Sequence, residues 1–251
     1  MKPGPLQRTT AAPMEHEHSA AAIRERLAAG PRLNYVRDWI YGGIDGSVTT
    51  FAIVSGVVGA ELSPPVILVM GFANLVADGF SMAASNYMGT RAEIEDLKQL
   101  EAVENRHIDV APEGEREEVR QIYQEKGFEG DELEHVVGLI TADRKRWVQT
   151  MLTEEYGLPR EVRSPRLAAA STFSAFILCG LAPLLPFVFG LTEAFGYSAL
   201  LTGAVFFAIG SIKSKWSTVP WWRSGLETLL VGSAAAGLAY VIGDLLSGLA
   251  R

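Results

Sequence analysis

Potential metal ligands recur at helical spacing in the middle of the chain. Residues three or four positions apart share one face of a helix, and like charges on one face repel each other unless a cation lies between them. Carboxylate oxygens combined with an imidazole nitrogen suit transition-metal dications, and a thioether adds a softness that calcium and magnesium do not use. Three sets follow this spacing and predict a metal site: Glu101, Glu104 and His107; Glu115 and Glu118; Met151 and Glu155.

Each of these sets, taken alone, is equally typical of a solvated helix face. Three of them within one short segment favour metal binding over that alternative. We expect a transported or stored iron(II) ion, with manganese(II), zinc or cobalt(II) as alternatives, and no tightly bound cofactor. His16 and His18 could add an entry site, although two histidines near a chain end are more often incidental.

A second group of polar residues lies inside apolar stretches. Asp45 is flanked by Gly43 and Gly46, and a later stretch carries polar or soft side chains every fourth residue: Asn74, Asp78, Met82 and Asn86. A carboxylate near the middle of a bilayer costs on the order of 3 kcal/mol, so such residues are functional candidates. We therefore predict that these five residues line an ion path. For Asp45 the alternative is a helix N-cap at the membrane surface.

Five apolar stretches are long enough to carry these residues across a membrane as helices. A helix that spans the hydrocarbon core needs roughly 20 mostly apolar residues, and a buried soluble helix of that length would show a polar stripe. The predicted spans are residues 39–61, 65–89, 167–189, 196–212 and 226–248. The chain is therefore predicted to be an all-α membrane protein, and several glycines in the first two spans would let helices approach closely.

The segment between the second and third spans predicts a small three-helix domain. Apolar residues recur at helical spacing from Ile94 to Val103 and again from Val136 to Ile140. Pro112 with Gly114, and Gly127 with Gly130, separate three helices. We expect the second span to continue directly into the first of them. The predicted organisation is a tail at 1–32, spans at 33–90, an acidic metal-binding domain at 91–166 and spans at 167–251.

The charge distribution predicts the orientation and excludes nucleic acid as a partner. The net charge of −7 belongs to residues 91–166, which hold 19 acidic against 12 basic residues. An acidic segment repels nucleic acid and attracts cations. Lys and Arg gather before the first span, in residues 91–166 and after the fourth span, which predicts a cytoplasmic N-terminus and domain and a C-terminus outside. The host would be a bacterial inner membrane or a vacuolar membrane.

These features together resemble the vacuolar iron transporter family. The resemblance rests on the run DGSVTTFA from Asp45, the run ADGFSMAASNY at 77–87, the acidic insertion, and the run GLAPLLP at 180–186. It implies a homodimer of five-helix protomers with the pore at the subunit interface, which exchanges cytoplasmic iron(II) or similar ions for protons. It also implies that Asp45 and Met82 handle the ion in the membrane.

For the insertion, the resemblance implies metal-binding glutamates that match Glu104, Glu115, Glu118 and Glu155, with Met151 as a soft ligand. Three positions depart from the family pattern, where glutamate, methionine and glutamate are replaced by His107, Leu152 and Asn74. Histidine binds the same ions, so we expect the site to persist with an altered metal preference.

Two other functions are compatible with parts of the sequence. Glu104 with His107, and Glu132 with His135, fit the Glu-x-x-His spacing of di-iron carboxylate bundles and suggest a membrane-anchored ferroxidase. About seventy-five residues cannot form four full-length helices, so that site would need two subunits. A chaperone-like membrane protein with an acidic binding domain is the other alternative. The sequence favours a transporter over both alternatives, so we do not expect the protein to be an enzyme.

Overall fold

Five helical segments of the computed structural model are long and apolar enough to cross a bilayer. The structure describes residues 17–30, 34–159 and 162–247. The five segments are α2 (Val36–Gly59), part of α3 (Pro64–Val110), α7 (Pro165–Gly180) followed by η1 (Ala182–Leu184) and α8 (Leu185–Val188), α9 (Ala194–Lys213) with η2 (Ser214–Trp216), and α10 (Trp221–Leu246). The described residues contain no strand, which agrees with the predicted all-α class and its five spans.

Helix α2 contacts each of the other four membrane segments. A β-carbon added at Gly42 would overlap the carbonyl oxygen of Thr172, and one added at Gly46 would overlap that of Phe176. Glycine therefore lets the backbones of α2 and α7 touch directly, as small residues do in membrane helix packing. Around this contact, buried apolar side chains from four of the five membrane segments form one core: Phe51, Val54, Val57, Ile67, Leu75, Phe176, Leu184 and Ala236.

The third span is not one regular helix. Proline lacks the backbone N–H that an α-helix needs, and Pro183 and Pro186 follow the end of α7 closely. The chain therefore passes from α7 through the short 3-10 turn η1 into α8.

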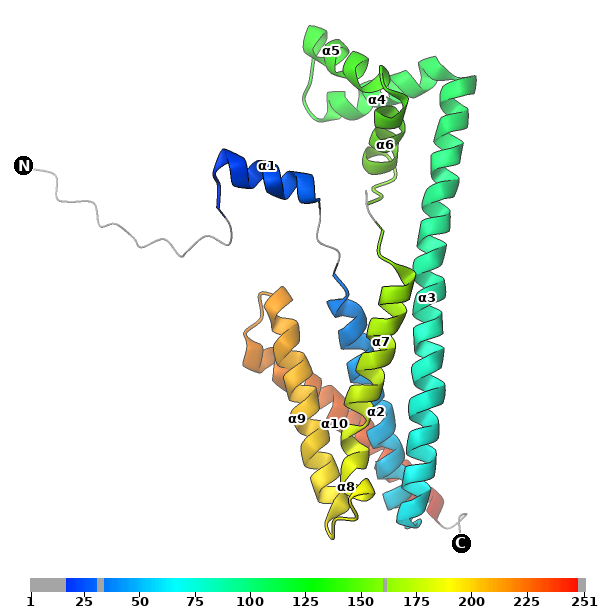
Figure 1. Ribbon diagram of the computed structural model, residues 1–251, viewed down its shortest axis with the longest axis vertical. Helices are drawn as coiled ribbons and strands as arrows, with labels where there is room; N and C mark the ends of the chain where they lie inside the picture. Colours follow the sequence, from blue (N-terminus) through cyan, green and yellow to red (C-terminus); the bar gives the residue numbers. More distant parts are fainter. Residues whose placement is uncertain (1–16, 31–33, 160–161, 248–251) are drawn as a thin grey trace, which may run out of the picture. The chain divides into compact units, whose positions relative to one another are not determined.

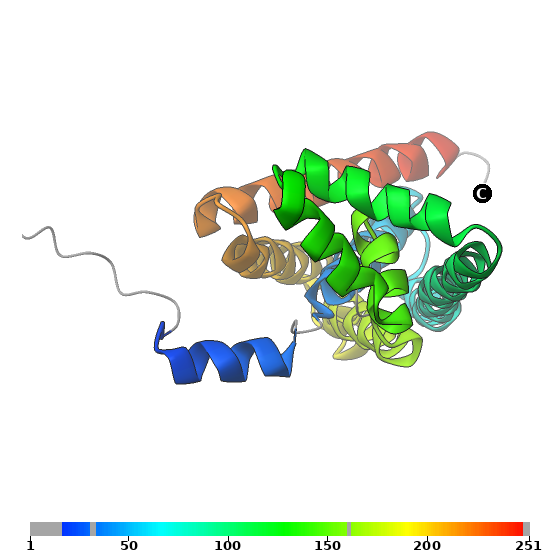
Figure 2. The same ribbon diagram turned by 90° about the horizontal axis from the view of Figure 1, so that it is seen from above.

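Helix α3 is 47 residues long and runs without a break from the membrane segment to Val110 (Figure 1). The predicted domain boundary at residue 91 falls inside this helix. Three further helices follow: α4 (Pro112–Glu125), α5 (Gly130–Thr141) and α6 (Arg144–Glu154). Figure 2 shows α4 leaving the end of α3 sideways.

The end of α3 packs with α4, α5 and α6 around a second apolar core that is separate from the first. Its buried residues are Ile108, Val119, Leu133, Val137, Ile140, Trp147, Val148, Met151 and Leu152. The sequence predicted three helices here, the first being the continuation of α3, but the structure has four helical segments. The predicted last helix is divided because the Asp143 side chain accepts a hydrogen bond from the Arg146 amide at 2.8 Å and so caps a new helix.

Within residues 1–33, which form a unit of their own, the structure describes one helix, α1 (Ala20–Ala29). The Ser19 hydroxyl caps it by accepting a hydrogen bond from the Ala22 amide at 3.3 Å. Part of the predicted tail at 1–32, including His16, and the predicted outer C-terminal residue Arg251 lie outside the described residues.

Candidate metal site and ion path

The corner between α3 and α4 brings potential metal ligands together. Pro112 occupies the first position of α4, where a missing N–H is tolerated, and it cannot continue α3. The Ala111 amide closes the end of α3 by donating to the His107 carbonyl at 2.7 Å. The last turns of α3 therefore face the first turn of α4.

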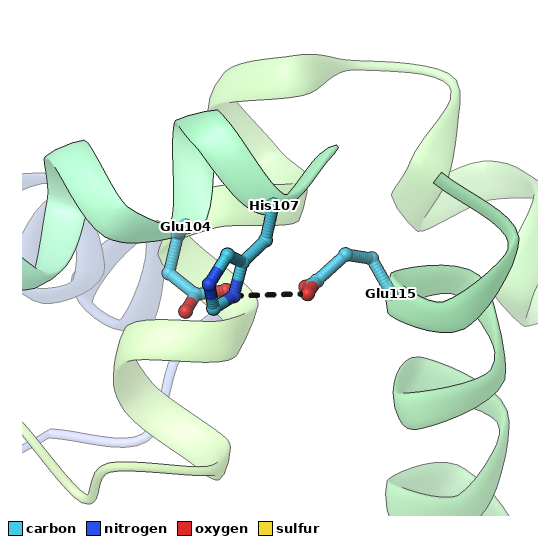
Figure 3. Close-up of side chains that lie close together, drawn as sticks. All are labelled: Glu104, His107 and Glu115. Atoms are coloured by element: carbon cyan, nitrogen blue, oxygen red, sulfur yellow. Dashed lines mark ion pairs between the residues drawn. The ribbon is translucent and has the colours of Figure 1, made fainter. Parts of the chain in front are cut away.

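Three side chains meet at this corner, Glu104 and His107 from α3 and Glu115 from α4 (Figure 3). One potential ligand atom from each lies within 4.8 Å of the others. His107 Nδ1 is 3.3 Å from Glu115 Oε1. Two carboxylates and an imidazole form a donor set that suits iron(II), manganese(II), cobalt(II) and zinc.

The two glutamates are buried with unsatisfied oxygens. Glu104 is 1% exposed and Glu115 is 4% exposed. The phenol of Tyr156 donates to Glu104 Oε1 at 2.9 Å, but the Oε2 atoms of Glu104 and Glu115 are both buried without a hydrogen-bond partner among the described residues. Removing a charged oxygen from water without a partner is strongly unfavourable. A cation between these oxygens would compensate both, so the residues fit a bound metal ion.

The electrostatics of the corner extend to two further glutamates. Burial raises the pKa of Glu115 to about 7, with smaller contributions from the charges of Glu104, Glu118 and Glu155 and from a hydrogen bond with the Glu104 carboxylate that favours the protonated form. Burial also raises the pKa of Glu155, as do the charges of Glu118 and Glu104, while His107 opposes the shift. Glu118 and Glu155 therefore lie close enough to the three-residue cluster to act on its charge. Below neutral pH a metal ion that binds Glu115 must displace its proton, and above neutral pH the carboxylate is free to bind the ion.

Two other predicted ligands occupy different positions. Met151 is fully buried in the apolar core of α3–α6. Glu101 is exposed and lines a separate cavity of about 430 Å³ together with Asn105 and Arg144. The structure thus does not bring Glu101 into the cluster of Glu104, His107 and Glu115.

In the membrane segment, Asp45 lies in the interior of α2. The alternative that it caps the N-terminus of a helix is therefore wrong. Its electrostatic neighbour is Asp78 of α3. One turn before Asp78, the Asn74 side chain donates to the Thr49 hydroxyl at 3.3 Å, and that hydroxyl donates to the Asp45 carbonyl at 2.8 Å. The Asn74–Thr49 contact joins α2 and α3 one turn from Asp78.

Met82 and Asn86, the remaining residues of the predicted path, line a cavity of about 320 Å³ beside Asp38. The Asn86 amide nitrogen contacts the Asp38 carboxylate at 3.0 Å and the Thr172 hydroxyl at 2.7 Å. Asn86 thus joins α3 to α2 and α7 by hydrogen bonds. Arg163 donates to both oxygens of Asp38, at 2.9 and 2.7 Å. Asp38, 3% exposed, is a buried carboxylate whose charge the chain itself neutralises.

Sequence reasoning missed three residues here: Asp38, Arg163 and Tyr156. A signal existed for Asp38, because a carboxylate at the start of an apolar span needs a partner. Arg163 and Tyr156 lie near the loop between α6 and α7, where no periodic pattern marks them.

The structure does not support the ferroxidase alternative. Glu132 and His135 lie on α5. The one group of three or more potential ligands that the described residues form contains neither of them.

Comparison with known proteins extends over most of the chain. The family model described as "VIT family" matches residues 36–244. The chain is 33% identical to a vacuolar iron transporter of Toxoplasma gondii over 226 residues, which cover 85% of this chain and 74% of the relative. It is 33% identical to the vacuolar iron transporter of Centaurea cyanus over 82% of this chain and 85% of the relative.

A third relative, vacuolar iron transporter 1 of Arabidopsis thaliana, is 30% identical over 82% of this chain and 84% of its own length. These names describe transporters and not enzymes, in agreement with the prediction from the sequence. The resemblance seen in the motifs is thereby confirmed, and the chain belongs to the VIT family.

Proposed function

We propose that this membrane transporter moves iron(II), and in second place manganese(II), out of the cytoplasm in exchange for protons. Relatives named for iron transport support iron as the cargo. The observation that carries the proposal is the continuity of α3. This one helix holds Met82 and Asp78 in its membrane segment and Glu104 and His107 at its far end. At 1.5 Å per residue, Met82 and Glu104 are about 33 Å apart along the helix.

The first step is capture of the ion at the corner of α3 and α4. Glu104, His107 and Glu115 supply ligands from two helices, and Glu118 and Glu155 add negative charge around them. Met151 would add a soft ligand only by turning out of the apolar core. Because metal binding requires deprotonated ligands, each captured ion displaces protons from the cluster.

The second step is transfer across the membrane. In this step Asp45 of α2 and Met82 of α3 bind the ion as it loses water molecules from its hydration shell. Asp78 and Asn74 lie along the same helix as Met82 and complete the path. Protons and metal ions compete for the same carboxylate oxygens, so protonation from the far side would release the ion. Asn86 helps hold the three helices around this path through its bonds to Asp38 and Thr172.

A homodimer would enclose this path. Asp78 is exposed on the surface of the single chain although it lies in a membrane segment. A carboxylate that faces lipid is costly, whereas a second copy against α3 would cover it. The positive charges near the start of α2 and the end of α9 favour a cytoplasmic location for this side of the membrane and for α4–α6.

Transport by reconstituted protein tests the proposal. Vesicles containing the full chain should accumulate iron(II) when a pH gradient is applied, with slower uptake of manganese(II), cobalt(II) and zinc. Asp45→Asn should lower uptake at least tenfold while the protein keeps its melting temperature. Asp244→Asn, which removes a carboxylate from α10, is the matched control and should transport normally. Equal uptake by the Asp45 variant and the unsubstituted protein would refute the path, and uptake independent of the gradient would refute proton exchange.

A further inference from the structure

Two cavities adjoin one another on the side of the bundle formed by α2, α9 and α10. The first has a volume of about 460 Å³ and includes Arg37, Ile40 and Lys213 in its lining. The second has a volume of about 440 Å³ and includes Ile44, Lys213 and Val231. Lys213 lines both, and Ile40 and Ile44 are one turn apart on α2. The two cavities therefore lie next to each other along α2, and together they are called the groove.

The first cavity is positively charged. Arg37 and Lys213 are its charged lining residues, and the cavity has no carboxylate in its lining. Neither cation forms an ion pair with another described residue. The Arg37 guanidinium lies 5.3 Å from the centre of the Tyr41 ring, a cation–π contact that leaves its donors available. A phosphate group would satisfy these donors.

The groove becomes apolar where it enters the membrane segment. Ile44, Leu230 and Val231 line its second part, and all three lie within apolar spans. At the other end, Trp216, Trp221 and Trp222 are exposed around the ends of α9 and α10. Exposed tryptophans mark the level of the lipid headgroups. The two cations thus lie at headgroup depth and the apolar part lies at the depth of acyl chains.

We propose that this groove binds one anionic phospholipid, whose phosphate contacts Arg37 and Lys213 and whose acyl chain lies along Ile44, Leu230 and Val231. The combination of a cationic end with an apolar continuation fits an amphiphile, whereas free phosphate would use the cationic end alone. Glu227 also lines the second cavity and adds one carboxylate to the groove. The two cations outnumber it, so the groove prefers a lipid with net negative charge over one with an ammonium group.

Native mass spectrometry of the full chain, stripped of lipid in detergent, tests this site. Titration with phosphatidylglycerol, phosphatidylethanolamine and phosphatidylcholine of identical acyl chains should show one phosphatidylglycerol per chain bound about tenfold more tightly than the other two. Arg37→Gln and Lys213→Gln should each remove that preference. Lys215→Gln and Arg223→Gln are matched controls, because they remove a cation at the same boundary but outside the groove, and they should retain it.

A third substitution tests the acyl part without changing charge. Val231→Trp would fill the second cavity and should weaken phosphatidylglycerol binding at least fivefold while the melting temperature in lipid-free detergent stays unchanged. Inorganic phosphate, used as a competitor, should not displace the lipid at millimolar concentration. Equal binding of phosphatidylcholine or phosphatidylethanolamine, equal losses in the control variants, or displacement by inorganic phosphate would overturn the proposal.

Discussion

Asp38 and Glu104 are both buried carboxylates, but the protein compensates them differently. Asp38, in the membrane segment, receives hydrogen bonds from Arg163 on both oxygens and from Asn86 on one. Glu104, at the far end of α3, receives one hydrogen bond from Tyr156, and its second oxygen has no partner among the described residues. A residue of the chain thus neutralises Asp38, whereas one oxygen of Glu104 is left without a hydrogen-bond partner among the described residues, as the proposed metal site requires.

The two regions also differ in how tightly their helices pack. Around Asp38, glycines let the α2 and α7 backbones touch, which leaves little room for rearrangement. Around Glu104, short helices contact one another through an apolar core, and the glutamates lie at a corner between two helices. The ion pair of Asp38 therefore lies at a tightly packed helix junction. The carboxylate of Glu104, whose charge is only partly compensated, lies at a corner where a proposed ligand would bind and leave.

The strongest test of this contrast removes the charges of the corner. In Glu104→Gln/Glu115→Gln, two charge-assisted ligand bonds of about 1.5–3 kcal/mol each are lost, so the affinity for cobalt(II), used as a spectroscopic probe, should fall about a thousandfold. For the unsubstituted protein, metal at 100 times its dissociation constant should stabilise the fold by about 2.7 kcal/mol. Calorimetric titration and thermal unfolding in detergent measure both quantities.

The matched control is Glu113→Gln/Glu125→Gln, which removes two exposed carboxylates from the same helix. It should bind cobalt(II) within about threefold of the unsubstituted protein, as expected for screened surface charges. If both double variants lost affinity equally, general negative charge would explain metal binding and the corner would not be a specific site.

The second test removes the internal cation. Arg163→Gln leaves Asp38 buried with Asn86 as its remaining partner, which should lower the free energy of unfolding by about 3 kcal/mol. Arg163→Gln/Asp38→Asn should recover much of this loss because no buried charge remains. Arg166→Gln, an exposed arginine at the start of α7, is the control and should change stability by less than about 0.5 kcal/mol. Denaturant titrations in micelles that gave equal losses for Arg163 and Arg166 would contradict the permanent pairing.

The third test uses pH. The pKa of Glu115 is about 7 in the folded protein and 4.5 in its ordinary state, so the metal-free fold binds the proton more tightly than the unfolded chain. Its contribution to stability is therefore present below pH 4.5 and is lost as pH rises through 7. Metal binding follows the opposite course, because one displaced proton raises affinity about tenfold per pH unit.

Between pH 5 and 7, manganese(II) affinity should thus rise about 100-fold and then level off. Glu115→Gln should reduce the slope of this profile, whereas Glu125→Gln, at the exposed end of α4, should leave the slope unchanged. An unreduced slope in the Glu115 variant would assign the displaced proton to another group.

Much of this arrangement could be predicted from local sequence patterns. The spans follow from apolar length, and the continuity of α3 agrees with the absence of proline between Pro65 and Val110. The pairing of His107 with Glu115 could be anticipated because Pro112 ends the helix between them. Local patterns carry these features because each depends on residues close together in the chain.

Other features depend on residues far apart or on competition between local signals. Asp38 and Arg163 are 125 positions apart, so only the fold identifies them as partners. The division of α5 from α6 depends on one capping aspartate, Asp143, inside a run that otherwise continues as a helix. Helical spacing placed Met151 beside Glu155, but its apolar side chain packs into the core formed with Val119 and Val137. Periodicity assigns a face to a residue, and tertiary packing decides what that face contacts.

The smallest expected effect concerns the one hydrogen bond that Glu104 does receive. The Tyr156 phenol donates to Glu104 Oε1, which holds that oxygen in place and leaves Oε2 without a partner among the described residues. Tyr156→Phe keeps the ring and removes only this donor, so Glu104 should lose its fixed orientation and cobalt(II) affinity should fall about tenfold, as for other partners of metal ligands. The visible absorption of bound cobalt(II) should also change, because one ligand is no longer held in place.

Tyr123→Phe, which removes a phenol from α4 that donates no hydrogen bond to the cluster, is the control. The melting temperatures of both metal-free variants should match that of the unsubstituted protein within a few degrees. Since a purely structural role for Tyr156 would lower stability without altering the cobalt(II) spectrum, an unchanged spectrum and affinity in Tyr156→Phe would show that Glu104 is oriented by packing alone. A changed spectrum at constant stability would instead show that the chain presets the one oxygen it leaves for the metal.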